Sequence, residues 1–332
     1  MPSASVPPVT PPSSTIDRWT EQVRSGDVRA ISRAMTAIEN RSRDAENLLR
    51  RLFPSTGHSY CIGITGAPGT GKSTLVDRLA AHYRSQQQTV GVIAVDPSSP
   101  FTGGAILGDR IRMQGHASDE GVFIRSMATR GSLGGLSQAT SDAALLLDAA
   151  GKKYVIVETV GVGQGEVEIA RLADCTLVVL VPGMGDDVQN LKAGVMEIAD
   201  VFVLNKADRE GAERFEQQLR AILQLLPERG GWKPPIVLTV ATQNEGIGEL
   251  AQQIDSFRAH FGQQSSRRAR ELALWRERLI GLLAERMLHR VIDKITKDGT
   301  LERLAAEVAE RRRDPYSAVS DILQRAGVEG ER

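Results

Sequence analysis

The sequence predicts an α/β fold in which a mostly parallel sheet is covered by helices on both faces, with helical extensions on its N- and C-terminal sides. Short runs rich in β-branched residues recur along the middle of the chain, and amphipathic segments separate most of them. Runs that are apolar throughout and alternate with helices are typical of parallel strands buried on both faces. The predicted strands are residues 61–64, 90–95, 122–126, 154–158, 176–181, 201–205 and 236–240.

The beginning of the chain has a different pattern. Residues 1–14 are rich in Pro and Ser, which predicts disorder. Residues 15–56 predict an N-terminal helical segment, with two helices broken near Gly26-Asp27. The apolar positions with helical spacing in this segment are Val28, Ile31, Met35 and Ile38.

The sheet-forming domain is expected to span residues 57–262, and residues 263–332 to form a C-terminal helical arm. In the arm, Asp314-Pro315 is typical of a helix start and Gly327 of a helix end. An apolar stripe along the arm is compatible with packing on the chain's own domain and with packing on a second copy. This stripe consists of Leu272, Trp275, Leu279, Leu282, Met287, Val291 and Ile295.

The composition disfavours several classes of protein. Lys plus Arg and Asp plus Glu both number 41, so no global field attracts nucleic acid or an anionic membrane. The five histidines lack metal-ligand spacing, and Cys61 and Cys175 lie in apolar runs typical of buried thiols. No apolar stretch reaches the roughly 18 residues of a membrane span, and no secretory signal is evident. We therefore expect a cytoplasmic protein without a nucleic-acid or membrane partner.

The stretch CIGITGAPGTGKSTL runs from a predicted strand through a glycine-rich loop into a predicted helix. It matches the phosphate-loop pattern of glycine, four residues, then Gly-Lys-Ser. In such a loop, backbone N–H groups surround the phosphates, the lysine reaches the β- and γ-phosphates, and the serine hydroxyl binds Mg²⁺. The sequence thus predicts a P-loop NTPase. The residues expected at the phosphates are Gly66, Ala67, Pro68, Gly69, Thr70, Gly71, Lys72, Ser73 and Thr74.

Three carboxylates are candidates to complete a magnesium site. Asp96 follows a predicted strand, at the sheet edge where ligands bind in open α/β sheets, and Asp109 lies further along in a glycine-bearing segment. Each of these two is also compatible with a plain helix cap. Glu158 ends the apolar run YVIVE, where a charge is costly unless it is paired or bound to metal. Because Mg²⁺ prefers oxygen ligands, the predicted ligands are Ser73, Asp96, Asp109 and Glu158.

The run VFVLNKAD indicates which base is bound. Its Asp208 carboxylate can accept hydrogen bonds from guanine N1–H and the 2-amino group, a donor pair that adenine lacks. We expect Asn205 to tie this loop to the phosphate loop and the Lys206 stem to cover the base. The sequence therefore predicts GTP and GDP as ligands. Backbone N–H groups for guanine O6 are expected from Val240, Ala241 and Thr242.

The turn after Glu158 departs from that of many GTPases. Gly161 stands where the backbone would approach the γ-phosphate, but the next residue, often a water-positioning Gln, is Val162. A glutamine occurs only at Gln164. GTPases commonly gain rate when a partner supplies or orders a missing transition-state group. We therefore expect slow hydrolysis by the chain alone and stimulation by a partner.

Six motifs in this order resemble one family. They are GAPGTGKST, VDPSSPFTGGAILGDRIRM, TRGSLGGLS, ETVGVGQGE, GMGDDVQNLKAG and NKAD. Together with DPYSAVSDIL in the arm, they make most of the chain similar to the MeaB / methylmalonic aciduria type A proteins. These are GTPases of the signal-recognition-particle-like class, and related sequences were once labelled arginine/ornithine transport ATPases.

The resemblance implies a G-protein chaperone of an adenosylcobalamin-dependent acyl-CoA mutase. Family members gate delivery of the B12 cofactor and protect or reactivate the mutase, with GTP hydrolysis as the timer, and they form homodimers through C-terminal helices. For this chain we expect Mg²⁺ as cofactor and no tight binding of B12. The implied catalytic residues are Lys72, Asp96, Glu158 and Lys192, and the implied switch residues for partner coupling are Asp186, Gln189 and Lys192.

Two other functions stay open on the sequence. A nickel-insertion GTPase needs Cys or His ligands near the switches, and the chain offers none beyond its two cysteines in apolar runs. A transport-coupled ATPase requires ATP preference and a membrane partner, which Asp208 and the lack of an apolar span disfavour. One position departs from the family: Val240 replaces the Ser that usually precedes the Ala of the guanine loop. With valine at this position, a backbone contact to the guanine is preserved, whereas a side-chain hydroxyl contact is lost.

Overall fold

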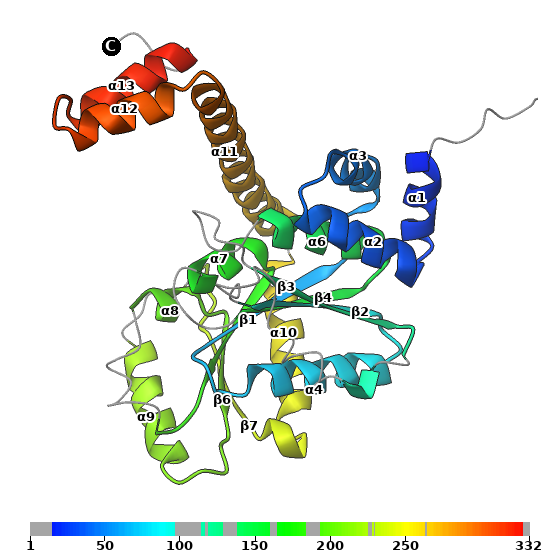
Figure 1. Cartoon of the computed structure of the whole chain (residues 1–332). Helices are drawn as coiled ribbons and strands as arrows, with labels where there is room; N and C mark the ends of the chain where they lie inside the picture. The colour runs from blue at the N-terminus through cyan, green and yellow to red at the C-terminus, as the bar shows by residue number, and fades with distance from the viewer. Residues whose placement is uncertain are drawn as a thin grey trace, which may run out of the picture. The chain divides into compact units, whose positions relative to one another are not determined.

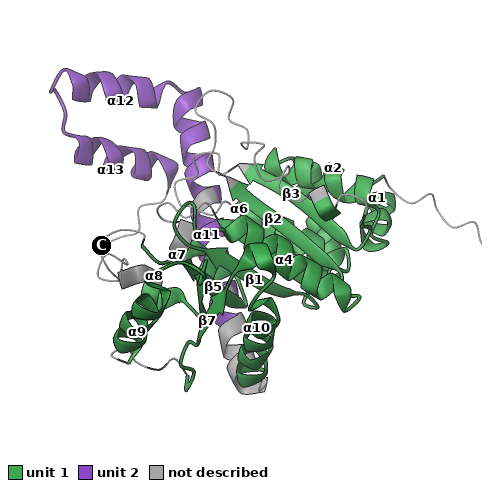
Figure 2. Cartoon of the chain, turned by 90° about the horizontal axis from the view of Figure 1, so that it is seen from below, with its two compact units in different colours: residues 1–264 green, residues 265–332 purple. Residues whose placement is uncertain are grey.

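The computed structural model describes residues 15–96, 114–116, 119–128, 138–159, 165–183, 193–224, 228, 230–262 and 264–327. The chain divides into two compact units, residues 1–264 and residues 265–332, which Figure 2 shows in different colours. The first unit contains the sheet. The second consists of helices wherever the structure describes regular elements.

The first unit is built on a seven-stranded parallel sheet with the order β3-β2-β4-β1-β5-β6-β7 (Figure 1). Each pair of neighbouring strands is parallel, so the carboxyl ends of all strands lie at one edge, where ligands bind in such sheets. This confirms the predicted fold class. The strands are β1 (Tyr60–Thr65), β2 (Val90–Asp96), β3 (Val122–Ala128), β4 (Tyr154–Thr159), β5 (Cys175–Leu180), β6 (Val201–Asn205) and β7 (Ile236–Thr239).

Helices cover both faces of the sheet, as predicted (Figure 1). On one face, α4 and α10 share a core with the central strands, and Ile62, Leu79 and Phe257 are fully buried in it. On the other face, helices α1, α2, α3 and α6 share a core with β2 and β4 that includes Met35 and Ile93. The helices are α1 (Thr15–Arg24), α2 (Val28–Glu39), α3 (Arg43–Leu52), α4 (Lys72–Ser85), α6 (Gln138–Ala149), α7 (Gly165–Leu172), α8 (Ala193–Ile198), α9 (Ala212–Leu223) and α10 (Ile247–Phe261), with short 3-10 turns η1 (Phe53–Ser55), η2 (Gln114–His116) and η4 (Ala241–Gln243).

The N-terminal segment forms three helices, whereas the sequence led us to expect two. The expected break at Gly26-Asp27 is present, and the Asp27 carboxylate caps α2 by accepting a backbone N–H of its first turn at 2.6 Å. A second break separates α2 from α3. Arg41 adopts a positive φ of 51°, and the Ser42 hydroxyl accepts the Ala45 N–H at 3.1 Å. This serine cap starts a new helix where the apolar spacing alone suggested continuity.

The second unit has well-defined helix ends. The Asp314 carboxylate accepts the Ser317 N–H at 2.9 Å, with Pro315 in the first turn, and Gly327 ends the last helix with a φ of 72°. The sequence predicted both of these ends correctly. The helices are α11 (Gln264–Lys297), α12 (Thr300–Ala309) and α13 (Pro315–Ala326).

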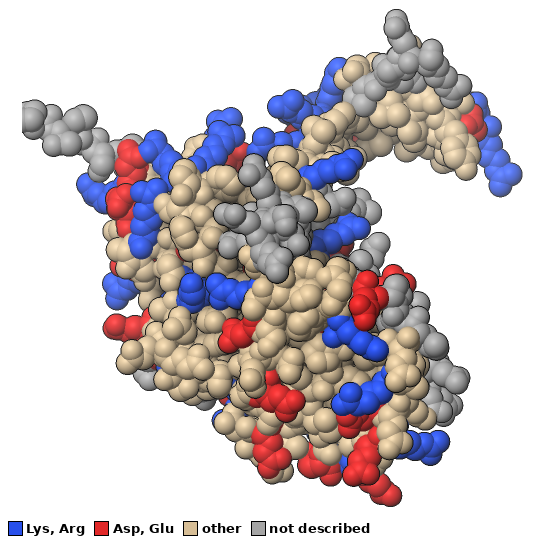
Figure 3. All heavy atoms as spheres, turned by 180° about the vertical axis from the view of Figure 1, so that it is seen from behind, with Lys and Arg blue, Asp and Glu red and all other residues tan. Residues whose placement is uncertain are grey.

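The surface carries both signs of charge. Basic and acidic side chains both occur across the face shown in Figure 3, consistent with the equal numbers of the two in the sequence. Of the helices that the structure describes, none combines the length and the apolar character that crossing a bilayer requires.

Candidate functional site

The phosphate loop joins the end of β1 to the start of α4, as the sequence predicted. Gly66 has a φ of 143°, and a Cβ there would lie 2.2 Å from the Val179 carbonyl oxygen of the neighbouring strand β5. Gly71 has a φ of 92°, and a Cβ there would lie 2.5 Å from the Asn205 amide nitrogen. Both contacts are too close for any side chain. The two glycines are therefore required by backbone conformation and by the close approach of neighbouring elements.

The Lys72 side chain lies inside this loop. It is only 6% exposed, and its ammonium donates hydrogen bonds to Gly66 O at 2.8 Å and Ala67 O at 3.1 Å. The Thr70 hydroxyl also donates to Ala67 O, at 2.9 Å. The loop thus places an ammonium group beside the N-terminus of α4, where the unpaired N–H groups of the first turn carry partial positive charge. This combination is suited to binding the phosphates of a nucleotide.

Ser73 and Glu158 meet at the carboxyl edge of the sheet. The Ser73 hydroxyl donates to Glu158 Oε1 at 2.8 Å, and Glu158 is only 5% exposed. Strand β4 lies between β1 and β2, which brings Glu158 level with Ile64 and Ala94 of its neighbours. A serine hydroxyl and a buried carboxylate are oxygen donors of the kind that Mg²⁺ takes, so these two residues fit the predicted magnesium site. Of the other predicted ligands, Asp96 is placed only by its backbone, as the last residue of β2.

The loop after β6, for which the sequence predicts guanine recognition, is fastened to the phosphate loop by two side chains. Asn205 ends β6 and is 2% exposed, and its amide donates to Thr70 O at 2.8 Å. The Lys206 ammonium donates to Gly69 O at 2.8 Å, from a backbone with a φ of 58°. Asp208 follows on the exposed turn after this strand. The connection between the two loops through Asn205 is the one expected from the sequence.

The loop that follows β7 is the second segment for which the sequence predicts contact with guanine. The side-chain oxygen of Asn205, Oδ1, accepts hydrogen bonds from the Thr239 hydroxyl at 3.1 Å and from the Ala241 N–H at 3.2 Å. The Val240 N–H donates within the loop, to Glu245 O at 3.2 Å. Asn205 therefore holds three parts of the site at once, namely the phosphate loop, the end of β7 and the turn η4. Sequence reasoning missed Thr239, since nothing in its local pattern distinguishes it from any other strand residue.

Several predicted site residues lie outside the described part of the chain. Asp109 belongs to the stretch between β2 and η2, and Gly161 to the stretch between β4 and α7. The switch residues Asp186, Gln189 and Lys192 lie between β5 and α8, in a further stretch outside the described residues. Their roles stay predictions.

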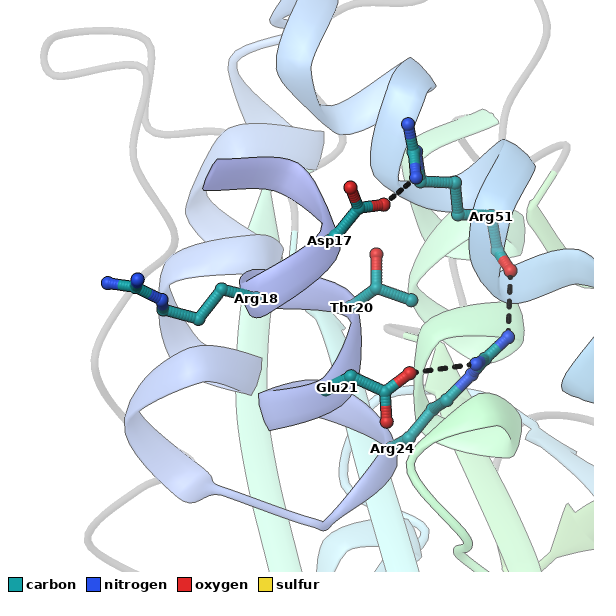
Figure 4. A pocket seen from close by; sticks show the side chains of 6 residues that line it. All are labelled: Asp17, Arg18, Thr20, Glu21, Arg24 and Arg51. Atoms are coloured by element: carbon teal, nitrogen blue, oxygen red, sulfur yellow. Dashed lines mark hydrogen bonds and ion pairs between the residues drawn. The ribbon is translucent and has the colours of Figure 1, made fainter. Parts of the chain in front are cut away.

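A pocket of about 300 Å³ lies between α1 and α3, away from this site (Figure 4). The acidic and basic side chains that line it pair with one another: Arg51 with Asp17, and Arg24 with Glu21 at 3.0 Å. Arg24 also donates to Arg51 O at 3.1 Å, while Arg18 points away from these pairs in Figure 4. The charges of the pocket are largely paired within α1 or between α1 and α3, so we assign it no ligand.

The two cysteines are free thiols, as expected for packing residues. Burial is the main cause that raises the pKa of the Cys61 thiol, and a raised pKa lowers the fraction of the reactive thiolate. Within the described ranges, His, Cys, Asp and Glu side chains do not gather in groups of three or more that suit a metal ion.

Comparisons with known proteins agree with this geometry. The family described as "Methylmalonyl Co-A mutase-associated GTPase MeaB" matches residues 31–296. The chain is 49% identical to a protein of Pyrococcus abyssi named as a GTPase, over 93% of this chain and 96% of the relative. It is 31% identical to the mouse protein named "Methylmalonic aciduria type A homolog, mitochondrial", over 80% of this chain and 69% of the relative.

A solved structure is also similar. The crystal structure of an LAO/AO transport system kinase superposes with a TM-score of 0.71 and 26% identity, covering 95% of this chain and 99% of that one. The family match spans the phosphate loop, the buried glutamate and the loop after β6 described above. This chain therefore belongs to the family of methylmalonyl-CoA mutase-associated GTPases, MeaB.

Proposed function

We propose that this chain is the GTP-hydrolysing chaperone of an adenosylcobalamin-dependent acyl-CoA mutase, gating cofactor loading and protecting or reactivating the mutase. The observation that carries the proposal is the match of residues 31–296 to a family named for its association with methylmalonyl-CoA mutase. The similarity to a mouse protein named for methylmalonic aciduria supports it. The client is methylmalonyl-CoA mutase or a close relative of it.

The site residues have complementary roles in this proposal. Lys72 and the N-terminus of α4 would offset the charge of the phosphates. Ser73 and Glu158, together with Asp96 and Asp109, would hold Mg²⁺, which neutralises charge that develops on the β- and γ-phosphate oxygens. Asp208 would read the guanine. Because Asn205 bonds to the phosphate loop, it would keep the base and phosphate subsites at a fixed separation, which favours a productive alignment of GTP.

We further propose that the chain acts as a homodimer through its C-terminal helices. Leu272, Leu279 and Leu283 of α11 are each about 60% exposed, and further apolar side chains on α11 and α13 are also exposed. Large contiguous apolar surfaces are uncommon on monomers and mark interaction sites. Size measurement by light scattering tests this, and a monomer at micromolar concentration would contradict it.

Hydrolysis by the chain alone is proposed to be slow, and a mutase is proposed to stimulate it. Purified chain would be assayed for GTP hydrolysis alone and with methylmalonyl-, ethylmalonyl-, isobutyryl- and 2-hydroxyisobutyryl-CoA mutase. We expect one of the four to raise the rate at least about tenfold, a modest value beside the 10³–10⁵ of an arginine finger. High turnover without a partner, unchanged by all four mutases, would contradict the proposal.

A variant with altered base recognition provides the matched control. In Asp208→Asn, the side-chain amide can donate to the 2-oxo group of xanthine, and the acceptor for the guanine 2-amino group is lost. With the same mutase, this variant should lose stimulated hydrolysis of GTP and show it with XTP. Such a result separates a nucleotide effect from damage to the mutase-binding surface, because the protein surface is otherwise unchanged.

A further inference from the structure

Two buried threonines form a side-chain hydrogen bond beside the predicted magnesium site. Thr65 ends β1 and Thr159 ends β4, and the Thr159 hydroxyl donates to the Thr65 hydroxyl oxygen at 2.9 Å. Thr65 is fully buried and Thr159 is only 4% exposed. A buried hydroxyl without a hydrogen bond is costly, so this contact satisfies two polar groups that water does not reach.

This contact lies where the backbone pairing of the two strands ends. The last pair in the register of β1 and β4 is Ile64 with Glu158, and the two threonines are the next residues on each strand. On its other side, Thr65 pairs with Val178 of β5. Gly66, the first residue of the phosphate loop, follows Thr65 directly. The hydroxyl contact therefore joins the end of β4 to the start of the phosphate loop.

Glu158 and Thr159 point to opposite faces of the sheet, because side chains alternate along a strand. On one face, Glu158 accepts the hydrogen bond from Ser73 of α4 at 2.8 Å. On the other face, Thr159 continues the row of Val155 and Val157, which belong to the core that also contains α2 and α6. The end of β4 is thus held on both faces, to α4 by Glu158 and to β1 by Thr159.

Helix α7 and the residue that follows it lie close against the threonine-bearing face of β1. A Cβ on Gly63, two residues before Thr65, would lie 2.6 Å from Ile169 Cγ1 and 2.9 Å from Ala173 Cβ. These distances are well below the roughly 3.5–4.0 Å at which carbon atoms pack. The threonines therefore lie on a tightly packed, apolar face, where a hydrogen bond is electrostatically stronger than in water.

We propose that Thr65 and Thr159, called here the threonine pair, position the Glu158 carboxylate for magnesium binding. The inference rests on the proposed role of Glu158 as a magnesium ligand. Because Glu158 precedes Thr159 directly, a movement of the end of β4 also moves the carboxylate. The hydrogen bond to Thr65 keeps that end at a fixed distance from the phosphate loop. Both threonines are positioning residues, because they act through Glu158.

The test measures the Mg²⁺ concentration that half-maximally raises the affinity of the full chain for a fluorescent, non-hydrolysable GTP analogue. Thr159→Val keeps the shape of the side chain and removes the donor, so it should raise this concentration about two- to tenfold, the range of one net hydrogen bond. Thr159→Ser keeps the hydroxyl and should keep the wild-type value.

Thr176→Val is the matched control, because it makes the same change at a buried position of the same sheet. Thr176 lies near the amino end of β5, opposite the edge that carries the site. Among the described residues, its hydroxyl makes no hydrogen bond. This variant should leave the Mg²⁺ requirement unchanged.

The double variant Thr65→Val/Thr159→Val separates positioning from stability. Replacing both partners of a buried hydrogen bond by apolar groups of the same shape is nearly neutral for stability, whereas removing one leaves a buried polar group unsatisfied. Thr159→Val alone should therefore lower the melting temperature of the nucleotide-free chain by about 2–4 °C, and the double variant should recover most of that loss. Its Mg²⁺ requirement should stay raised, because no directed hydrogen bond holds the end of β4. A Mg²⁺ requirement that recovers together with the melting temperature would refute the positioning role.

Glu158→Gln separates the threonine pair from the ligand assignment on which it rests. If this variant raises the Mg²⁺ requirement while the threonine variants leave it unchanged, the threonine pair is refuted and the ligand assignment stands. If Glu158→Gln leaves the Mg²⁺ requirement unchanged, the assignment fails and the proposal for the threonine pair fails with it. Neither result bears on the choice of mutase, because the assay contains only the chain, the GTP analogue and Mg²⁺.

Discussion

Replacing Asn205 with Ala should destabilise the fold and weaken GTP binding together. The Asn205 side chain makes three hydrogen bonds in a buried position, to Thr70 O, the Thr239 hydroxyl and the Ala241 N–H. Each contributes about 1 kcal/mol net, so the substitution should cost about 3 kcal/mol of unfolding free energy. For a unit of this size, that corresponds to a fall in melting temperature of about 6–12 °C. Thermal unfolding followed by circular dichroism measures it, and titration with a fluorescent GTP analogue measures the loss of affinity.

A graded series makes this prediction sharper. Thr239→Val removes one of the three hydrogen bonds and leaves the Asn205 oxygen its second partner, so it should cost only about 1 kcal/mol. Gln243→Ala, at an exposed position of the same turn, should leave both stability and affinity unchanged. The reasoning is refuted if Asn205→Ala lowers the melting temperature by less than about 2 °C. Equal effects of the Asn205 and Thr239 changes would also contradict the three-bond account.

Four further substitutions test the predicted nucleotide site. Asp208→Asn should lose the charge-assisted hydrogen bond to the guanine 2-amino group, at about 1.5 kcal/mol or more, hence at least about tenfold in GTP affinity. Competition binding measures this, and ATP competing as well as GTP with the wild-type chain would overturn the base assignment. Gly66→Ala places a Cβ 2.2 Å from a backbone oxygen, so we expect little of this variant to fold. Thermal melting measures the folded fraction. Glu158→Ala should mainly impair the Mg²⁺-dependent step, whereas Gln164→Ala should alter coupling to the client more than basal turnover. Abolished basal turnover in a folded Gln164→Ala chain would show that the turn after β4 was misread.

The sheet could be predicted because the apolar composition of each strand indicates that the strand is buried on both faces. Runs such as YVIVE and VFVLN are apolar at nearly every position, as a strand buried on both faces requires. The phosphate loop could be predicted for a similar reason, since its spacing fixes both the glycines and the lysine. In each case, the physical requirement is satisfied within a few neighbouring residues. The local sequence is therefore enough to predict the strands and the phosphate loop.

The features that could not be predicted depend on residues that are distant in sequence or on weak local signals. Thr239 meets Asn205 across 34 positions, and only the pairing of β6 with β7 brings them together. The break before α3 was missed because its local signal is weak, namely the single residue Ser42 that caps the start of α3. Helical spacing shows that a helix has an apolar face and says nothing of what covers that face.

The core beneath the N-terminal helices has a consequence for how this protein tolerates truncation. Ile31, Met35 and Leu48 are fully buried in the same cluster as Ile93 of β2 and Leu147 of α6. A shortened chain beginning at residue 57 would keep the whole nucleotide site and lose the cover of one sheet face. The exposed apolar surface should make such a chain aggregate during synthesis, even though every residue predicted to contact GTP is present. Affinity tags and fusion partners should therefore be attached before residue 15, and the helices that follow that residue should be kept.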